Sequence, residues 1–252
     1  MKISMVVFII SCLVVVISCA TLLIYNKNKV LAMSGRDSFV DEDAFTRQRK
    51  RMVEEQIAYR DIKDKRVLEA MESVPRHLFI PEEVRFSSYY DQPVPIGFGQ
   101  TISQPYIVAF MTELLKPEGD DVVLEVGTGS GYQAAILARL VKQVYTIELV
   151  EDLGKEARNR LKTLGYGNVE VMIGDGYKGW PEHAPFNAVI VTAAAEHIPQ
   201  PLIDQLKPGG RMVIPVGGVY AVQELMLITK DVSSKVVKES IIPVRFVPLL
   251  RK

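Results

Sequence analysis

Short apolar runs alternate with amphipathic stretches along the second half of the chain. The runs with the length and the Val and Ile content of buried strands are 122–126, 143–149, 169–173, 188–192 and 211–216. The stretches between them with helical spacing are 131–141, 151–164 and 201–206. Two more strand-like runs, 222–229 and 236–244, predict an antiparallel pair at a sheet edge. These seven strands, alternating with helices, predict an α/β fold with a doubly wound, mostly parallel sheet.

The preceding stretch, 42–116, predicts helices joined by irregular loops. Residues 65–73 and 105–115 each place apolar side chains on one helical face. Prolines and glycines between 75 and 99 interrupt the chain. We therefore expect a helical N-terminal part at 42–116, followed by the sheet at 117–252.

The N-terminus is uncharged and apolar from Ile3 to Tyr25, a length that suits a membrane-spanning helix. Several interpretations stay open. The segment 1–25 is an uncleaved anchor, a signal peptide cleaved near Ser18-Cys19-Ala20, a lipoprotein signal with Cys19 acylated, or a buried core helix. Residues 26–41 have the polar and small side chains of a linker.

Composition narrows the function classes. Lys and Arg together number 30, as do Asp and Glu, so the chain lacks the basic excess of a nucleic-acid-binding protein and we expect no nucleic-acid partner. The two cysteines, Cys12 and Cys19, both lie in the apolar segment. The globular part therefore has no disulfide framework, cysteine nucleophile or cysteine metal site, and we expect no metal.

The sharpest motif follows the first predicted strand and reads Gly127-Thr128-Gly129-Ser130-Gly131. Glycines let a backbone turn tightly against a ligand, although they could also serve only the turn itself. The spacing differs from the G-x-G-x-x-G of dinucleotide enzymes, and no G-K-[ST] for a triphosphate is present. A tight loop without a diphosphate cradle suits S-adenosylmethionine. We expect Gly127, Thr128, Gly129 and Gly131 to bind this cofactor.

Acidic residues near this loop complete the predicted cofactor site. Glu148 ends the next strand, where a carboxylate can accept both ribose hydroxyls. Asp175 and Gly176 follow the third strand and are candidates for contact with the adenine amino group. Glu125, just before the loop, is a candidate partner of the methionine ammonium.

The stretch from about Arg47 to Arg251 resembles the protein-L-isoaspartate O-methyltransferase family. Besides the glycine loop, the blocks that carry the resemblance are Val74–Pro81, Pro95–Tyr106, Gly174–Gly176, Val191–Ala194, Leu206–Gly210 and Val244–Leu249. The resemblance implies a Rossmann-like methyltransferase fold, with a helical extension and an apolar segment before it. It also implies methyl transfer from S-adenosylmethionine to the free carboxylate of L-isoaspartyl residues in damaged proteins and peptides, which starts their repair to aspartate through a succinimide.

The resemblance also implies site residues. Ser103 corresponds to the hydroxyl assigned the active-site role in the family. A hydroxyl can donate a hydrogen bond to the substrate carboxylate, but Ser103 is equally a good N-cap for the helix that follows. Thr101 and Ile102 would line the cofactor pocket through their backbones. Arg245 and Val247 would form part of the substrate cleft.

Two rival functions stay open. One is a methyltransferase with another acceptor, although the run 191–195 lacks the Pro-Pro block of enzymes that methylate base amino groups. The other is a membrane-tethered protein that binds S-adenosylmethionine without turnover. Because the cofactor is made in the cytoplasm, we expect a catalytic domain that faces the cytoplasm, with membrane contact through residues 3–25. Export as a lipoprotein or signal-peptide product is the alternative. We also expect the protein to be a monomer.

Overall fold

The computed structural model describes residues 43–218 and 221–251, so the predicted anchor or signal at 1–25 and the linker at 26–41 lie outside the described residues. The chain divides into two compact units between Arg47 and Gln48. Residues 43–47, the described part of the first unit, are helical. No helix within the described ranges is long and apolar enough to cross a membrane. The second unit carries all the features described below.

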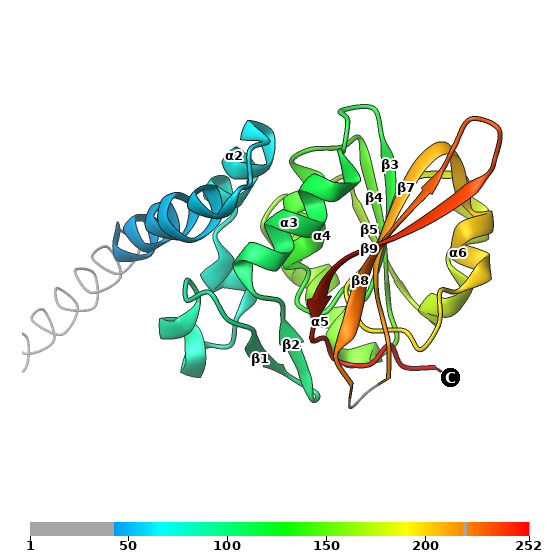
Figure 1. The fold of residues 1–252 in the computed structure, drawn as a ribbon. Helices are drawn as coiled ribbons and strands as arrows, with labels where there is room; N and C mark the ends of the chain where they lie inside the picture. Colours follow the sequence, from blue (N-terminus) through cyan, green and yellow to red (C-terminus); the bar gives the residue numbers. More distant parts are fainter. Residues whose placement is uncertain (1–42, 219–220, 252) are drawn as a thin grey trace, which may run out of the picture. The chain divides into compact units, whose positions relative to one another are not determined.

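A seven-stranded sheet forms the centre of this unit, in the order β5-β4-β3-β6-β7-β8-β9 (Figure 1). The strands are β3 (Val122–Val126), β4 (Gln143–Glu148), β5 (Val169–Ile173), β6 (Phe186–Val191), β7 (Leu206–Val216), β8 (Gln223–Lys230) and β9 (Val236–Val244). Strands β3 to β7 pair in parallel, while β8 and β9 are antiparallel to their neighbours. The predicted doubly wound, mostly parallel sheet and its antiparallel edge are confirmed.

The chain order places β3 at a topological switch point. From β3 the chain proceeds to β4 and β5 on one side, and then returns to β6 on the other side of β3. The connection that leaves β3 for β4 and the one that leaves β6 for β7 therefore run in opposite directions. This opens a crevice between the carboxyl ends of β3 and β6, where open α/β sheets bind ligands. The glycine loop begins in this crevice, directly after Val126.

Helices cover both faces of the sheet. The helices α3 (Pro105–Leu115) and α4 (Tyr132–Ala138) lie on one face and α6 (Gln200–Asp204) on the other (Figure 1). The helix α5 (Glu151–Thr163) begins with two acidic residues and has Arg160 and Lys162 in its last turn. Charges of these signs at the two ends stabilise a helix through its dipole. The core beside α6 is built from Leu124, Val126, Val189 and Val191 of the central strands together with Leu202 of that helix.

One strand begins earlier than predicted. The sequence predicts a helix over 201–206 and a strand over 211–216, but α6 ends at Asp204 and β7 already begins at Leu206. Leu206 pairs with Phe186, whereas Arg211 pairs with Ala188, so the register shifts across the intervening Lys-Pro-Gly-Gly block. A bulge absorbs these extra residues, which a pattern of apolar positions does not reveal.

The part before the sheet is less regular than predicted. A π-helix (Met52–Ile57) and a 3₁₀ turn (Ala58–Arg60) precede α2 (Lys65–Ser73), and two further 3₁₀ turns follow at Arg76–Phe79 and Glu82–Ser87. A hairpin of β1 (Val94–Gly97) and β2 (Gln100–Ile102) then leads into α3. This hairpin lies where the sequence predicts only interrupted chain.

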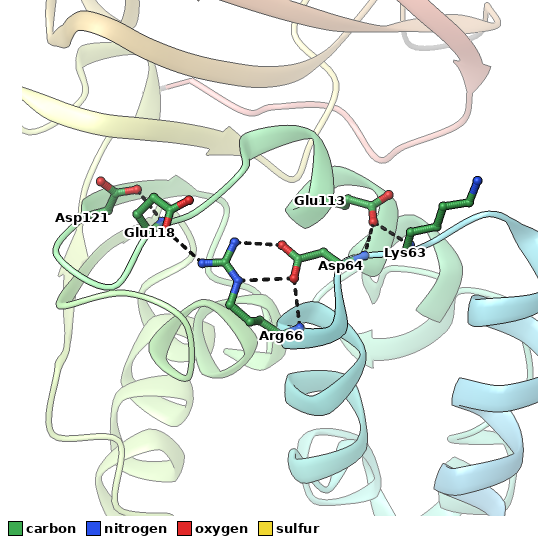
Figure 2. A network of polar contacts seen from close by, with 6 residues as sticks. All are labelled: Lys63, Asp64, Arg66, Glu113, Glu118 and Asp121. Carbon is green, nitrogen blue, oxygen red and sulfur yellow. Dashed lines mark hydrogen bonds and ion pairs between the residues drawn. The ribbon is translucent and has the colours of Figure 1, made fainter.

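A polar network joins the start of α2 to the end of α3 (Figure 2). Asp64 caps α2 by accepting the Arg66 N–H, and the Arg66 guanidinium bridges Asp64 and Glu118. Glu113, in α3, accepts the backbone N–H groups of Lys63 and Asp64 at 2.7 and 2.6 Å. The network therefore anchors the N-terminal part to the helix that follows Ser103.

Candidate active site

The loop after β3 is fixed by contact between Gly127 and Thr192. Gly127 has φ of +99°, and a Cβ built on it would stand 2.5 Å from Thr192 Oγ1. The Thr192 hydroxyl donates to the Gly127 carbonyl at 2.6 Å, and the Thr192 N–H donates to the Val126 carbonyl at 2.9 Å. Only glycine fits at the start of this loop, which is thereby held against the end of β6.

Glu148, the last residue of β4, holds the same loop from the other side. Its Oε2 accepts the Gly129 N–H at 2.8 Å, and its Oε1 accepts the Val150 N–H at 3.0 Å. Each carboxylate oxygen has a further lone pair, so both can still accept from a ribose diol. The position of Glu148 therefore fits its predicted role.

An open cleft enclosing about 750 Å³ lies beyond the carboxyl end of β3. The glycine loop, the end of β4, residues 100–103 and residues 247–250 contribute to its walls. The predicted cofactor-binding residues that line it are Thr101, Ile102, Gly127, Thr128, Gly129, Glu148 and Gly176. Among the described residues, no lysine or arginine lines this cleft. A cleft with an acidic residue and no basic side chain suits a cofactor that carries a cationic centre and no phosphate.

Three predicted cofactor residues do not line the cleft. Gly131 has φ of +89° and starts α4, where a Cβ would meet Leu161 at 3.1 Å. Asp175 caps a 3₁₀ turn, with its Oδ1 accepting the Tyr177 N–H at 3.0 Å. Glu125 is fully buried in β3. Contact between these three residues and the cofactor stays a prediction.

Glu125 has an unusual environment for a carboxyl group. Neither of its oxygens has a hydrogen-bond partner among the described residues. Burial is the main cause that raises the pKa of Glu125 to about 8; the neighbouring Thr146 hydroxyl opposes this rise and the Glu148 charge adds to it. The group is therefore mostly protonated at neutral pH, so it presents no full negative charge to an ammonium until a ligand lowers this pKa.

Ser103 lies between two clefts and lines both of them. The alternative that Ser103 caps the next helix is wrong, because Gln104 occupies the N-cap position of α3. The Gln104 side chain forms no capping hydrogen bond. Asp91 serves the helix start instead, accepting the Tyr106 N–H at 3.1 Å. The Ser103 hydroxyl forms no hydrogen bond with any described residue and is free to contact a ligand.

The second cleft, about 950 Å³ and open, lies on the other side of Ser103. The predicted substrate residues Arg245 and Val247 line it, and Val247 also lines the first cleft. Gln223 fixes this segment, because its Oε1 accepts the Phe246 N–H at 2.7 Å and its Nε2 donates to the Phe246 carbonyl at 3.3 Å. Further along the chain, Pro248 forms an isolated parallel β-bridge with Ala194.

Two parts of the site were not singled out from the sequence. Thr192 lines both clefts, and its position at the end of a predicted strand next to β3 was the signal that could have found it. The other part is the β1–β2 hairpin itself, since its two very short strands leave little pattern in the sequence. Thr101 and Ile102 were predicted to line the first cleft, but their neighbour Gln100, which also lines it, was not. Among residues 43–218 and 221–251, no group of His, Cys, Asp or Glu is arranged to hold a metal ion.

Comparison with known proteins agrees with this geometry. Residues 47–252 match the family model described as protein-L-isoaspartate(D-aspartate) O-methyltransferase. A protein-L-isoaspartate O-methyltransferase 2 from Syntrophobacter fumaroxidans is 62% identical over 186 residues, which are 74% of this chain and 75% of the relative. A protein-L-isoaspartate O-methyltransferase from Opitutus terrae is 56% identical over 223 residues, 88% of this chain and 95% of the relative.

Solved structures show the same fold. A protein-L-isoaspartate O-methyltransferase superposes with a TM-score of 0.73 at 27% identity, over 79% of this chain and 65% of that one. A Plasmodium falciparum protein of the same description, in complex with S-adenosyl-L-homocysteine, gives a TM-score of 0.68 at 28% identity, over 81% and 99% of the two chains. Because the family match spans the whole described sheet and both clefts, the chain belongs to the protein-L-isoaspartate(D-aspartate) O-methyltransferase family and is an S-adenosylmethionine-dependent enzyme with a Rossmann-like fold.

Proposed function

We propose that this chain methylates the free carboxylate of L-isoaspartyl residues in damaged proteins and peptides, with Ser103 as its active-site hydroxyl. Membership of the family supports the reaction. The position of Ser103 carries the assignment of the residue: it lines the cofactor cleft and the neighbouring cleft, and its hydroxyl has no internal partner among the described residues. A hydroxyl at this junction can contact a nucleophile that enters from one cleft and a methyl group held in the other.

The walls of the first cleft suggest how the cofactor is held. Glu148 would accept the ribose hydroxyls, while the glycine loop would lie against the methionine part and Thr101 and Ile102 would close the cleft from the hairpin side. Bound S-adenosylmethionine supplies the methyl group, which leaves its sulfonium sulfur for a carboxylate oxygen.

The residues near Ser103 need only orient the acceptor. A carboxylate with a pKa near 4 is already ionised at neutral pH, so no general base has to remove a proton. The Ser103 hydroxyl would donate a hydrogen bond to one carboxylate oxygen and leave the other to react. Rate then comes mainly from proximity and alignment.

The second cleft would hold the isoaspartyl peptide. Arg245, Phe246 and Val247 follow the edge strand β9 and line the cleft, so their backbone groups are candidates to pair with an extended peptide. The methyl ester formed there would close to a succinimide more readily than the free acid, because methoxide leaves more easily than hydroxide. Hydrolysis of the succinimide can return normal aspartate.

The domain and its location are part of the proposal. Residues 42–252 would be the methyltransferase domain, with a helical part at 42–116 and the cofactor-binding sheet at 117–252, after a linker at 26–41 and an anchor or signal at 1–25. The supply of S-adenosylmethionine favours a domain on the cytoplasmic side, with membrane contact through residues 3–25, and the protein would be a monomer. Protease protection and membrane fractionation of the full chain would test this arrangement.

Methyl transfer to a matched pair of peptides tests the reaction. One peptide contains L-isoaspartate and the other L-aspartate at the same position, and both are incubated with labelled S-adenosylmethionine. We expect base-labile ester only on the isoaspartyl peptide. Cofactor binding with no transfer to either peptide would favour another acceptor, or a protein that binds the cofactor without turnover.

A further inference from the structure

Arg76 lies directly behind the Ser103 backbone and is completely buried. Its Nη2 donates to the Ser103 carbonyl at 2.7 Å, and its Nε donates to the Ser88 carbonyl at 2.8 Å. The guanidinium carbon lies 4.8 Å from the centre of the Tyr132 ring. Tyr132 begins α4 and lines the cofactor cleft. One side chain therefore contacts the residue proposed for catalysis and a residue of the cofactor wall.

A buried cation in this place has an electrostatic cost. Arg76 forms no ion pair within the described part of the chain, and its Nη1 is buried without a hydrogen-bond partner. Burial lowers the pKa of Arg76 to about 10, so it stays protonated at neutral pH. Hydrophobic residues of similar volume often replace buried charges without loss of stability, so core packing alone does not explain an arginine here.

The hydrogen bond from Arg76 acts on the Ser103 carbonyl, which lies outside the hydrogen-bond ladder of α3. The Val108 N–H bonds to the Gln104 carbonyl, so the Ser103 carbonyl precedes the first turn of α3. Arg76 fixes the direction of this carbonyl and with it the rotation of the Ser103 backbone. A change of tens of degrees in that rotation would move the hydroxyl by a distance comparable to the displacements of about 1 Å that cost enzymes about 100-fold in rate.

We propose that Arg76 is the positioning residue for Ser103, and that it aligns the Ser103 hydroxyl with the cofactor wall through its simultaneous contacts with the Ser103 carbonyl and the Tyr132 ring. The inference rests on the proposed function of Ser103. It assigns Arg76 no contact with substrate or cofactor, since Arg76 lines neither cleft.

A double-mutant cycle tests the proposal. In Arg76→Lys the charge is kept, but an ammonium lacks the planar fork that reaches two carbonyls at once. We expect R76K to lower kcat for the isoaspartyl peptide about tenfold or more, with the cofactor Kd within about twofold of the parent value. In a Ser103→Ala background, the same change should lower kcat by less than about twofold, because the group that Arg76 aligns is already gone.

Controls separate positioning from folding. Arg158→Lys is the matched substitution, since Arg158 also donates to a backbone carbonyl, that of Val171 at 2.6 Å, but away from both clefts, and it should leave kcat unchanged. Arg76→Met provides a second variant if R76K folds poorly. Equal fold-losses of kcat in the parent and Ser103→Ala backgrounds would overturn the proposal. Loss of the cooperative thermal transition in both R76K and R76M would also overturn it, by assigning Arg76 to folding. The unmodified chain is also assayed with the isoaspartyl peptide. If it transfers no methyl group, the proposed function fails; if it does and the variants behave otherwise than expected, only the proposal for Arg76 fails.

Discussion

Gly127 and Thr192 lie so close that a methyl group on Gly127 would stand 2.5 Å from the Thr192 hydroxyl oxygen. These residues follow neighbouring strands that are far apart in the sequence, and their hydrogen bond at 2.6 Å sets the shape of the cofactor loop. The closeness of this contact makes the loop sensitive to the smallest substitution.

Gly127→Ala should therefore weaken cofactor binding. The added Cβ meets Thr192 and the φ of +99° strains any residue with a side chain, a combined cost of about 1–3 kcal/mol. We expect the Kd for S-adenosylmethionine in calorimetry to rise by roughly tenfold. Gly119→Ala is the matched control, because nothing lies within 4 Å of a Cβ there. An unchanged Kd in G127A would contradict the placement of the loop.

Glu148→Gln should affect cofactor binding more than turnover. Each carboxylate oxygen of Glu148 accepts a hydrogen bond from a backbone N–H, that of Gly129 or Val150. The amide NH₂ of glutamine would therefore face one of these N–H groups, and both would be donors. We expect the cofactor Kd to rise tenfold or more, about 1.4 kcal/mol, while kcat at saturating cofactor changes less. Glu170→Gln, at an exposed position on β5, is the control. Equal effects of the two substitutions on Kd would argue against a ribose-binding role.

Ser103→Ala should lower kcat and leave the cofactor Kd unchanged. A hydrogen bond to a charged group is worth about 1.5–3 kcal/mol, or roughly 10- to 150-fold in rate. Some activity should persist because the acceptor needs no base. Ser103→Thr keeps a hydroxyl and should retain more activity than the alanine variant. Single-turnover transfer of labelled methyl measures both variants. Full activity in S103A would remove Ser103 from the mechanism.

Glu125 should make stability depend on pH. Its pKa is about 8 in the folded chain against an ordinary value of 4.5, so the folded state binds more protons between these values. The free energy of unfolding should therefore fall as pH rises from about 4.5 to 8, by an amount on the order of a few kcal/mol. Glu125→Gln stays neutral and should escape this fall. Thermal unfolding of both proteins without cofactor, from about pH 5 to 9, should show a gap that widens with pH; a constant gap would contradict the buried carboxyl.

Gln223→Ala should weaken binding of the isoaspartyl peptide. Gln223 holds both backbone groups of Phe246, so its loss frees the segment that lines the second cleft. We expect KM for the peptide to rise several-fold, consistent with about 1 kcal/mol for lost hydrogen bonds. Gln200→Ala removes an exposed amide bonded to Asp204 and serves as the control. If the peptide KM of Gln223→Ala equals that of Gln200→Ala, this segment does not take part in substrate binding.

Much of this architecture follows from local patterns. The buried strands and amphipathic helices were predicted nearly in place because period and composition are local properties; α2 and α3, for example, begin and end as expected. The sequence placed the glycine loop and Glu148 together, and both line the first cleft, because parallel strands bring their carboxyl ends to one edge of the sheet.

Other features depend on contacts between distant segments. The sequence left open whether Ser103 caps the next helix, because it does not show that Asp91, from before the β1–β2 hairpin, accepts the Tyr106 N–H at the start of this helix. The role of Arg76 depends on a tertiary neighbour, the Ser103 carbonyl, that no spacing along the chain records.

The two clefts share part of their lining. Thr101, Ser103, Thr192 and Val247 each border both of them. A molecule that occupies one cleft contacts residues that the other cleft also presents, so we expect the affinities of cofactor and peptide to be thermodynamically linked. Such coupling is reciprocal, so any gain in peptide affinity caused by the cofactor must be matched by an equal gain in cofactor affinity caused by the peptide.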